Sequence, residues 1–163
     1  MEAVAEKNLT KSREGKYLTF VLGTEEYGIE ILKVREIIGI MDITSVPQTP
    51  DYMKGVINLR GKVIPVIDLR LKFAMTEEEY TQETCTIVVE VNSSLIGIIV
   101  DTVSEVVDVG SDEIEETPQF GQGIDTDFIT GLGKVKGKII ILLDIEKVMS
   151  TEELEMVEEM AGN

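Results

Sequence analysis

The sequence predicts an all-β protein that consists of two small barrels related by internal duplication. Residues 55–68 indicate two buried strands joined by a tight hairpin, because β-branched runs lie on either side of Arg60-Gly61-Lys62. Residues 131–144 repeat this pattern, with glycine, lysine and aspartate at identical spacing. Each copy holds about five short strands, and a small sheet of this kind removes its edges by closing into a barrel.

A second match lies upstream of the hairpins and occurs in the same order, as a duplication requires. Tyr27-Gly28-Ile29, followed by Val34, Glu36 and Ile37, matches Ile96-Gly97-Ile98, followed by Val103, Glu105 and Val106. The offset between the copies grows from 69 residues there to 76 at the hairpins, so the second copy carries a longer middle loop. The pattern predicts a flexible tail at 1–16, a first barrel at 17–75, a linker at 76–84, a second barrel at 85–149 and a C-terminal helix at 150–163.

The first unit is expected to form strands at residues 17–22, 27–31 and 32–40 before its hairpin. The last of these is ambiguous, because its apolar residues also suit one face of a helix. Its β-branched content favours a strand that follows a short turn. Two prolines within residues 44–50 indicate a loop.

Within the first hairpin, Gly61 is the natural turn residue because glycine adopts positive φ at no steric cost. Pro65 lacks a backbone N–H, so its strand is expected to lie at a sheet edge or to carry a bulge. Asp68 then ends the apolar run.

The second unit is expected to form strands at residues 86–91, 95–101 and 104–109, followed by a long loop at 110–130. After the second hairpin, Ser150 and Glu153 have the spacing of a capping box, which marks the start of a helix. The helix is acidic with a weak apolar stripe, and we expect it to pack across the barrels.

Composition excludes several classes of function. The 163 residues carry a formal net charge of −16, which disfavours sequence-independent nucleic-acid binding and anionic membrane surfaces. The chain has no histidine, the commonest general base and transition-metal ligand. Its single cysteine, Cys85, excludes an internal disulfide. With no signal peptide and no long apolar run, we expect a cytoplasmic protein without membrane insertion.

Several chemical motifs come close to a site without completing one. Gly55 and Gly61-Lys62 resemble a phosphate-binding loop, but the spacing is one residue too long and the magnesium-binding Ser or Thr is missing. Asp68 and Asp144 hold equivalent repeat positions, so a pair of catalytic carboxylates is one alternative. Cap or turn residues that end strands are the simpler interpretation. We therefore predict no catalytic, cofactor-binding or metal-binding residues.

Two other residues indicate binding to a partner protein. Arg60 lies at a hairpin tip of an acidic protein, where it is either a solvated turn residue or an anchor at an interface. Phe120 follows Pro118 in the long loop and is either tucked beneath that loop or offered to a partner. Val34 and Glu36 share one strand, and the simpler interpretation is that one faces the core and the other faces solvent.

Two segments resemble a known family. E-Y-G-I-E-I-L-K-V-R-E-I-I at 26–38 and G-V-I-N-L-R-G-K-V-I-P-V-I-D-L-R at 55–70 closely resemble CheW, the family of coupling proteins in bacterial chemotaxis. The resemblance runs from about Tyr17 to Met149 and includes T-G-L-G at 130–133 and L-L-D-I-E-K at 142–147. The regulatory domain of the CheA histidine kinase and the front half of CheV share this fold. Because kinase and receiver segments are missing here, a stand-alone CheW-like protein fits best.

The resemblance implies two SH3-like five-stranded barrels and an adaptor with neither enzymatic activity nor cofactors. Its implied partners are the cytoplasmic tip of methyl-accepting chemoreceptors, held in a groove between the barrels, and the regulatory domain of CheA. The implied location is the inner face of the membrane, reached through receptor complexes. We expect a monomer when the protein is free and a component of a large array when it is assembled. A scaffold of the same fold for a kinase pathway outside motility is the alternative.

The resemblance also assigns residues to these partners. Positions tied to receptor coupling are matched by Val34, Glu36, Ile37 and Arg60, and a kinase contact is matched by Phe120. Glu115 stands where a basic residue is common in the family, so one charge pair of the kinase contact is not expected here.

Overall fold

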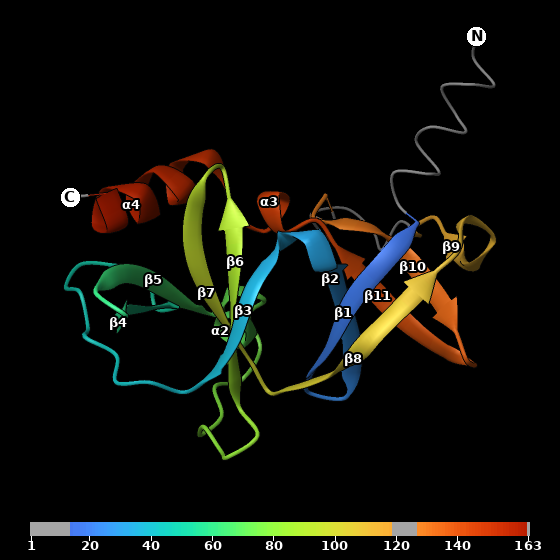
Figure 1. Ribbon diagram of the computed structural model, residues 1–163, viewed down its shortest axis with the longest axis horizontal. Helices are drawn as coiled ribbons and strands as arrows, with labels where there is room; N and C mark the ends of the chain where they lie inside the picture. The colour runs from blue at the N-terminus through green and yellow to red at the C-terminus, as the bar shows by residue number, and fades with distance from the viewer. Residues whose placement is uncertain (1–13, 119–126, 163) are drawn as a thin grey trace, which may run out of the picture.

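The computed structural model describes residues 14–118 and 127–162. Two β-sheets form two lobes, each an SH3-like barrel, as the sequence predicts (Figure 1). Most of the expected tail at 1–16 lies outside the described residues, and Gly15 and Lys16 already belong to the first strand. Among the described residues, no helix is long and apolar enough to cross a membrane.

One sheet has five strands in the order β3-β6-β7-β5-β4, so β3 and β4 are its edges. β5 and β7 are parallel, whereas the other neighbours are antiparallel. A 3-10 turn, η1 (Ile31–Lys33), precedes the sheet, and a short helix, α2 (Leu69–Lys72), follows β5. The strands are β3 (Val34–Gly39), β4 (Met53–Leu59), β5 (Lys62–Asp68), β6 (Cys85–Val91) and β7 (Ser94–Val100).

The other sheet has six strands in the order β8-β1-β2-β11-β10-β9. Its sixth strand, β9, is only two residues long, so a barrel of five main strands remains. The 3-10 turn η2 (Ser111–Glu113) precedes β9. The strands are β1 (Gly15–Leu22), β2 (Glu25–Glu30), β8 (Thr102–Val109), β9 (Ile114–Glu115), β10 (Ile129–Val135) and β11 (Lys138–Leu143).

The two sheets are built from exchanged parts of the repeat. The hairpin β1–β2 of the first copy joins β8, β10 and β11 of the second, whereas β6–β7 of the second copy joins β3, β4 and β5 of the first. When the copies are aligned, the two strand orders agree apart from β9, as duplication requires. The predicted limits at 17–75 and 85–149 therefore describe the repeat and do not coincide with the two barrels. Consecutive strands usually pair, and here the pairing between copies is set by contacts distant in sequence.

Three hydrophobic clusters stabilise this arrangement. The largest crosses between the barrels, from Phe20 and Ile29 of one sheet to Ile67 and Ile98 of the other. Tyr17, Val107, Val109, Val135, Ile140 and Leu142 fill one barrel, and Ile57, Leu59, Ile64, Val66, Val88 and Ile99 fill the other. A stack of aromatic rings adds to the shared cluster, with Phe73 between Tyr27 and Phe128 at centroid distances of 5.9 and 5.1 Å.

The predicted hairpin at 55–68 is confirmed as β4–β5. Its turn places both Arg60 and Gly61 at positive φ, 53° and 88°, as a type I′ turn requires. Neither expectation for Pro65 is met, because β5 sits between β4 and β7 and the register shift of the β4–β5 pair lies between Met53 and Gly55. Its missing N–H is tolerated because the pairing of β5 with β7 begins only at Val66.

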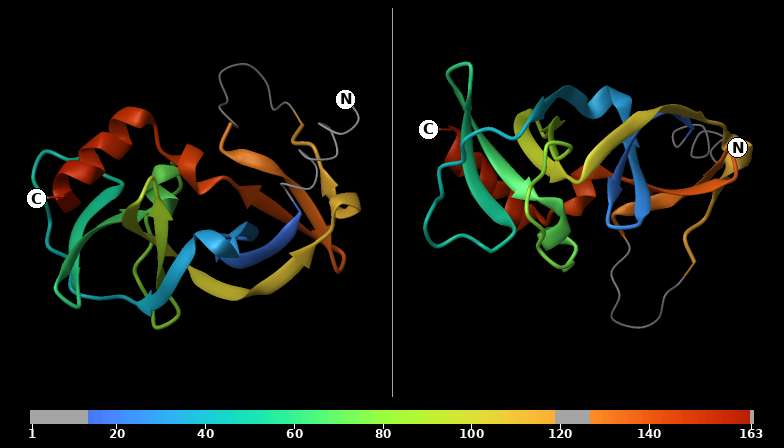
Figure 2. Two further views of the ribbon diagram at one scale, coloured as in Figure 1. Left: turned by 45° about the horizontal axis from the view of Figure 1, so that its top comes forward. Right: turned by 90° about the horizontal axis from the view of Figure 1, so that it is seen from below.

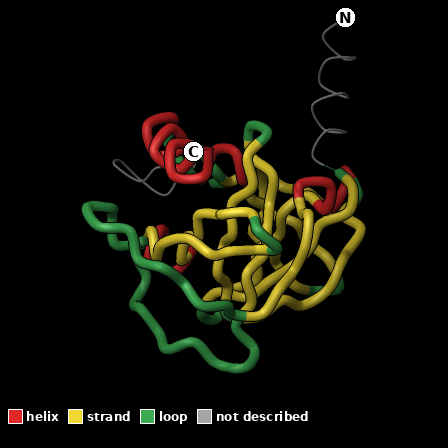
Figure 3. The backbone as a smooth tube through the Cα atoms, turned by 60° about the vertical axis from the view of Figure 1, so that its left-hand side comes forward, coloured by secondary structure: helices red, strands yellow, loops and turns green. Residues whose placement is uncertain are grey.

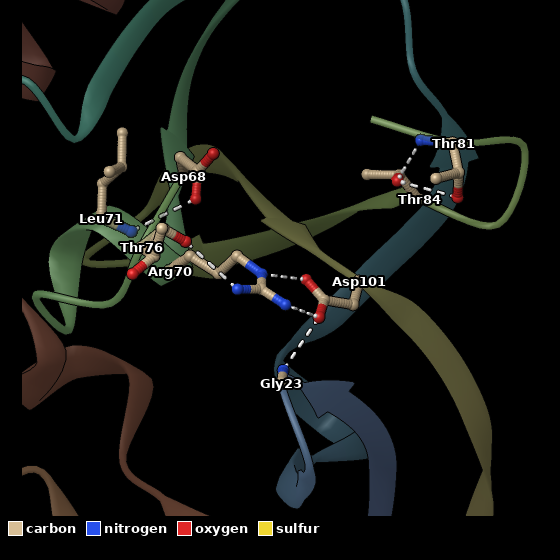
Figure 4. A network of polar contacts seen from close by, with 8 residues as sticks. All are labelled: Gly23, Asp68, Arg70, Leu71, Thr76, Thr81, Thr84 and Asp101. Atoms are coloured by element: carbon tan, nitrogen blue, oxygen red, sulfur yellow. Dashed lines mark hydrogen bonds and ion pairs between the residues drawn. The ribbon is translucent and has the colours of Figure 1, made fainter. Parts of the chain in front are cut away.

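A polar clamp joins the barrels where the chain crosses from β7 to β8 (Figure 4). Arg70 donates from Nε and Nη2 to the two carboxylate oxygens of Asp101, at 2.6 and 2.5 Å. Asp101 also accepts the backbone N–H of Gly23, which belongs to the β1–β2 turn of the other barrel, at 2.8 Å. The clamp therefore ties α2 of one barrel to a turn of the other.

The C-terminal segment forms two helices, α3 (Ile145–Val148) and α4 (Thr151–Gly162). The predicted capping box is confirmed, since Glu153 N–H donates to Ser150 Oγ at 3.1 Å and Ser150 N–H donates to Glu153 at 2.7 Å. The helix α4 lies over β5 and β7, with Leu154 buried against the shared cluster. Figure 3 shows it outside the strands, and Figure 1 shows it on the lobe of β5, β6 and β7 rather than across both barrels.

Candidate interaction site

Glu36 and Arg60 form an exposed ion pair between the edge strand β3 and the β4–β5 turn. The guanidinium donates twice, from Nη1 to Oε2 at 3.0 Å and from Nη2 to Oε1 at 2.5 Å. Because β3 and β4 are the two edges of the sheet, this pair connects the edges where the barrel closes. Two residues that the sequence predicts as parts of one site are thus in direct contact.

The backbone at this turn is strained, and the long side chain of Arg60 does not relieve the strain. Arg60 holds φ at 53°, a conformation in which Asn, Asp or Gly is strongly preferred. Asn58 supports the turn, since its Oδ1 accepts the N–H of Gly61 at 2.8 Å. A strained residue of unfavourable type at an exposed tip supports a role beyond folding.

The ion pair fixes the charges of both side chains. The Arg60 hydrogen bonds lower the pKa of Glu36 below its ordinary value, and the Glu36 carboxylate raises the pKa of Arg60. Both groups therefore stay charged at neutral pH. The site offers a partner one positive and one negative group at fixed spacing.

Two apolar side chains of the same sheet are also exposed. Ile37, next to Glu36 on β3, is 44% exposed, and Val63 on β5 is also 44% exposed. Val34 packs against the shared core cluster. Among the residues predicted for receptor coupling, it is therefore the one that anchors β3 to the core. The sequence interpretation missed Val63, which it placed in a buried run; its neighbour Ile64 does face the core.

The predicted kinase contact cannot be placed, because Phe120 lies outside the described residues. Glu115, at the position where the family often has a basic residue, is described and forms an ion pair with Lys134 at 2.6 Å. The pair links β9 to β10.

The two aspartates that could have formed a carboxylate pair act as helix caps. Asp68 accepts from Leu71 N–H at 3.3 Å and from the Tyr80 hydroxyl at 2.8 Å, and Asp144 accepts from Glu146 N–H at 3.1 Å. The simpler interpretation of both residues is thus confirmed. Within 14–118 and 127–162, no cluster of His, Cys, Asp and Glu is arranged to hold a metal ion.

Small hollows lie beside the junction of the barrels. One, of about 170 Å³, is lined by residues that include Glu30, Lys33 and Asp144. A second, of about 350 Å³, lies beside η1 and includes Ile31 and Leu32. The shared hydrophobic cluster crosses the junction of the two barrels.

Comparisons with known proteins agree with this fold. The model of the CheW-like domain family matches residues 16–153. The chemotaxis protein CheW of Klebsiella aerogenes is 44% identical over 90% of this chain and 88% of its own length. The chemotaxis protein CheW of Rhizobium meliloti is 34% identical over 93% of this chain and 97% of its own. The crystal structure of scaffolding protein TtCheW from Thermoanaerobacter tengcongensis aligns with a TM-score of 0.78 at 36% identity, covering 86% of this chain and 95% of that one.

Proposed function

The chain belongs to the CheW family of chemotaxis scaffolds, and from this membership we propose that it couples the cytoplasmic tip of transmembrane chemoreceptors to the regulatory domain of the CheA histidine kinase. The observation that carries the proposal is the exposed Glu36–Arg60 pair on a strained turn, in a sheet that also exposes Ile37 and Val63. Interface anchors combine such an arginine with apolar neighbours.

On the receptor side, a helix tip lies against the Glu36–Arg60 pair and contacts Ile37. Val34 contributes indirectly, because it packs β3 against the shared core and so holds Glu36 in place. A helix that places apolar side chains on a shallow surface, with charges at its margin, matches this arrangement. Binding would depend on salt concentration, since the ion pair is exposed.

On the kinase side, Phe120 and the loop that carries it contact the regulatory domain. The Glu115–Lys134 pair lies at the start of this loop. Because Glu115 is already neutralised within the chain, the kinase contact here depends more on apolar packing than on a charge pair. The two partners are assigned to different residues and would bind at the same time.

The mechanism is coupling without chemistry. A receptor changes kinase activity only if its two signalling states differ in the free energy with which they bind the scaffold. Individually moderate contacts gain strength when many copies assemble into an array. Such an array would hold the protein at the inner face of the membrane through its receptors, with no catalytic step of its own.

A pair of calorimetric titrations tests the proposal. The isolated regulatory domain of CheA and a soluble cytoplasmic fragment of a chemoreceptor, both from the same cell, are titrated separately into the full chain. Saturable binding of both is expected. Phe120→Ala should weaken kinase binding alone, and Arg60→Glu should weaken receptor binding alone. Failure of a folded protein to bind either partner would overturn the proposal and favour the alternative, a scaffold for a kinase pathway outside motility.

A further inference from the structure

A β-bulge in β3 sets the direction of the Glu36 side chain. The pairing of β3 with β6 joins Val34 to Val89 and then Glu36 to Val88, so Arg35 is an extra residue on β3. Side chains alternate between the two faces of a regular strand, which would place Val34 and Glu36 on the same face. The bulge interrupts this alternation.

The hydrophobic clusters show the result of this interruption. Val89 is buried in the cluster that the two barrels share, whereas Val88 is buried in the cluster inside one barrel. Residues that are paired across two strands share a face. Val34 therefore lies on the face of the shared cluster, and Glu36 lies on the opposite face, where it reaches Arg60. The bulge allows one strand to be anchored in the core and to present Glu36 at the site.

A bulge also occurs at the equivalent place in the other barrel. The register of β1 with β8 shifts at the segment that contains Glu105, which corresponds to Glu36 in the repeat. The strands β3 and β8 lie in different lobes (Figure 2). In each lobe, this glutamate pairs with a basic turn residue, Arg60 or Lys136. Bulges commonly redirect a side chain, and this role fits both copies.

Each barrel holds its bulge with a different contact. In the barrel of β1 and β8, Thr19 is fully buried opposite the bulge. Its Oγ1 donates to the carbonyl oxygen of Glu105 at 3.0 Å and accepts the N–H of Glu105 at 3.2 Å. The residue at the equivalent position of β6 is Val88, which has no hydroxyl to make these bonds.

An exposed ion pair takes the place of this threonine in the barrel of β3 and β6. The extra residue, Arg35, donates from Nη2 to Glu90 Oε2 at 2.7 Å, and the two side chains are 51% and 41% exposed. Their counterparts in the repeat are Ser104 and Val21, which cannot form an ion pair. The contact is therefore specific to the barrel with the proposed receptor site.

We infer that Arg35 is a positioning residue for the proposed receptor contact. Its ion pair with Glu90 holds the bulge that turns Glu36 toward Arg60. The inference rests on the proposed function, since it concerns the same site. An exposed ion pair contributes little to stability, so its loss lets the bulge shift while the core keeps its packing. The receptor then meets a site whose two charges are no longer at fixed spacing.

The affinity for a soluble cytoplasmic fragment of a chemoreceptor tests the inference. The fragment is titrated calorimetrically into the full chain, Arg35→Ala and Glu90→Ala. Both variants should bind about three- to fivefold more weakly, the size of effect that an exposed ion pair supports, with melting temperatures within a few degrees of the original. The two changes alter the net charge in opposite directions, so a long-range effect of charge would move the two affinities apart. Lys16→Ala removes an exposed ion pair with Asp108 in the other barrel and, as the matched control, should leave the affinity unchanged.

A rescue variant separates positioning from direct contact with the receptor. Val88→Thr places a hydroxyl opposite Glu36, as Thr19 does in the other barrel, and this hydroxyl can both donate to and accept from the bulged backbone. Combined with Arg35→Ala, it should restore the original affinity although the guanidinium is absent. If the buried hydroxyl destabilises the fold, the exchange of Arg35→Glu with Glu90→Arg should restore the affinity by remaking the ion pair.

The outcomes separate this inference from the proposed function. If the unmodified protein binds the fragment and Arg35→Ala binds it equally well, the positioning role is overturned and the proposed function stands. Weaker binding by Arg35→Ala that neither rescue variant restores would show that the guanidinium contacts the receptor itself, and would also overturn the positioning role. Absence of binding by the unmodified protein would overturn both.

Discussion

Arg70 donates two parallel hydrogen bonds to Asp101, and this pair joins the two barrels in addition to the apolar packing of their shared cluster. Burial alone would raise the pKa of Asp101, but the hydrogen bonds from Arg70 and from Gly23 N–H lower it below its ordinary value. Partly buried, bidentate pairs of this kind are among the stronger polar contacts in proteins. The clamp therefore contributes to the relative placement of the two barrels.

Replacing Arg70 by Ala should lower the free energy of unfolding by about 2 kcal/mol, because Asp101 would keep its burial and lose its charge-assisted bonds. Equilibrium denaturation in urea measures this change. Arg35→Ala is the control, because Arg35 forms a more exposed pair with Glu90 at 2.7 Å and should cost less than about 1 kcal/mol. Equal losses for the two variants would show that the Arg70 pair is an ordinary surface ion pair.

Glu153 makes the attachment of α4 dependent on pH. Burial alone would raise the pKa of this carboxyl group, but hydrogen bonds from Ser150 N–H, Tyr52 and Lys72 lower it from 4.5 to about 2. A folded-state pKa below the unfolded value gives stability that is present above pH 4.5 and lost as the pH falls toward 2. Glu153→Gln should cost about 2 kcal/mol at pH 7, and its deficit relative to the unmodified protein should shrink over that window.

Urea denaturation at a series of pH values measures this convergence. Glu152→Gln, an equal change at an exposed position on the same turn of α4, is the control for the loss of a charge at this end of the helix. A deficit for Glu153→Gln that stays constant from pH 7 to pH 2 would mean that the Glu153 carboxylate does not titrate as its contacts imply.

The sequence predicts the fold well where its signal is local. The hairpin at 55–68, the strand status of 32–40 and the Ser150–Glu153 cap all follow from residues close together in the chain, and the structure confirms them. The partition of strands between barrels does not follow, because β1–β2 and β6–β7 exchange places through parallel pairing with β11 and β5. No turn signal or periodicity encodes such a pairing.

The candidate site was predictable in part. Arg60 stood out because a basic residue lies at a hairpin tip, but its partner Glu36 is 24 residues away, and only the closure of the barrel brings them together. Val63 and Ile139 could not be recognised as exposed, since β-branched residues in a strand suit either face. Lys136 and Glu105, which form an ion pair at 3.4 Å, align in the repeat with Arg60 and Glu36.

Arg60→Glu should weaken binding of the receptor fragment while it lowers the melting temperature by no more than a few degrees, because an exposed turn buries little surface. The exchange variant Glu36→Arg with Arg60→Glu tests whether the pair itself suffices. It should restore the melting temperature by remaking the ion pair, without restoring binding, since the partner requires the positive charge at the tip. Recovery of binding in the exchange variant would show that Arg60 acts only by closing the barrel.

Lys136 and Gly137 in the β10–β11 turn hold φ at 54° and 76°. Lys136→Asn should stabilise the protein by about 0.5–1 kcal/mol, because Asn-Gly suits a type I′ turn and the exposed ion pair of Lys136 with Glu105, at 3.4 Å, is weak. Thermal denaturation measures the change. A variant that is less stable than the original would mean that the ion pair with Glu105 outweighs the strain of the turn.

Gly55 shows how closely the loop before β4 lies against the sheet. Its φ is +142°, and a Cβ built on it would lie 2.0 Å from the carbonyl oxygen of Thr44. Thr44 and Val56 exchange two backbone hydrogen bonds of 2.9 Å at the same place. Gly55→Ala must therefore displace the loop from β4, and we expect a loss of about 3 kcal/mol in the free energy of unfolding.

Gly39→Ala on β3, where a Cβ meets nothing within 4 Å, is the control and should change the free energy of unfolding by less than about 1 kcal/mol. Urea denaturation compares the two, and similar stability of both variants would mean that the loop moves away from β4 at little cost.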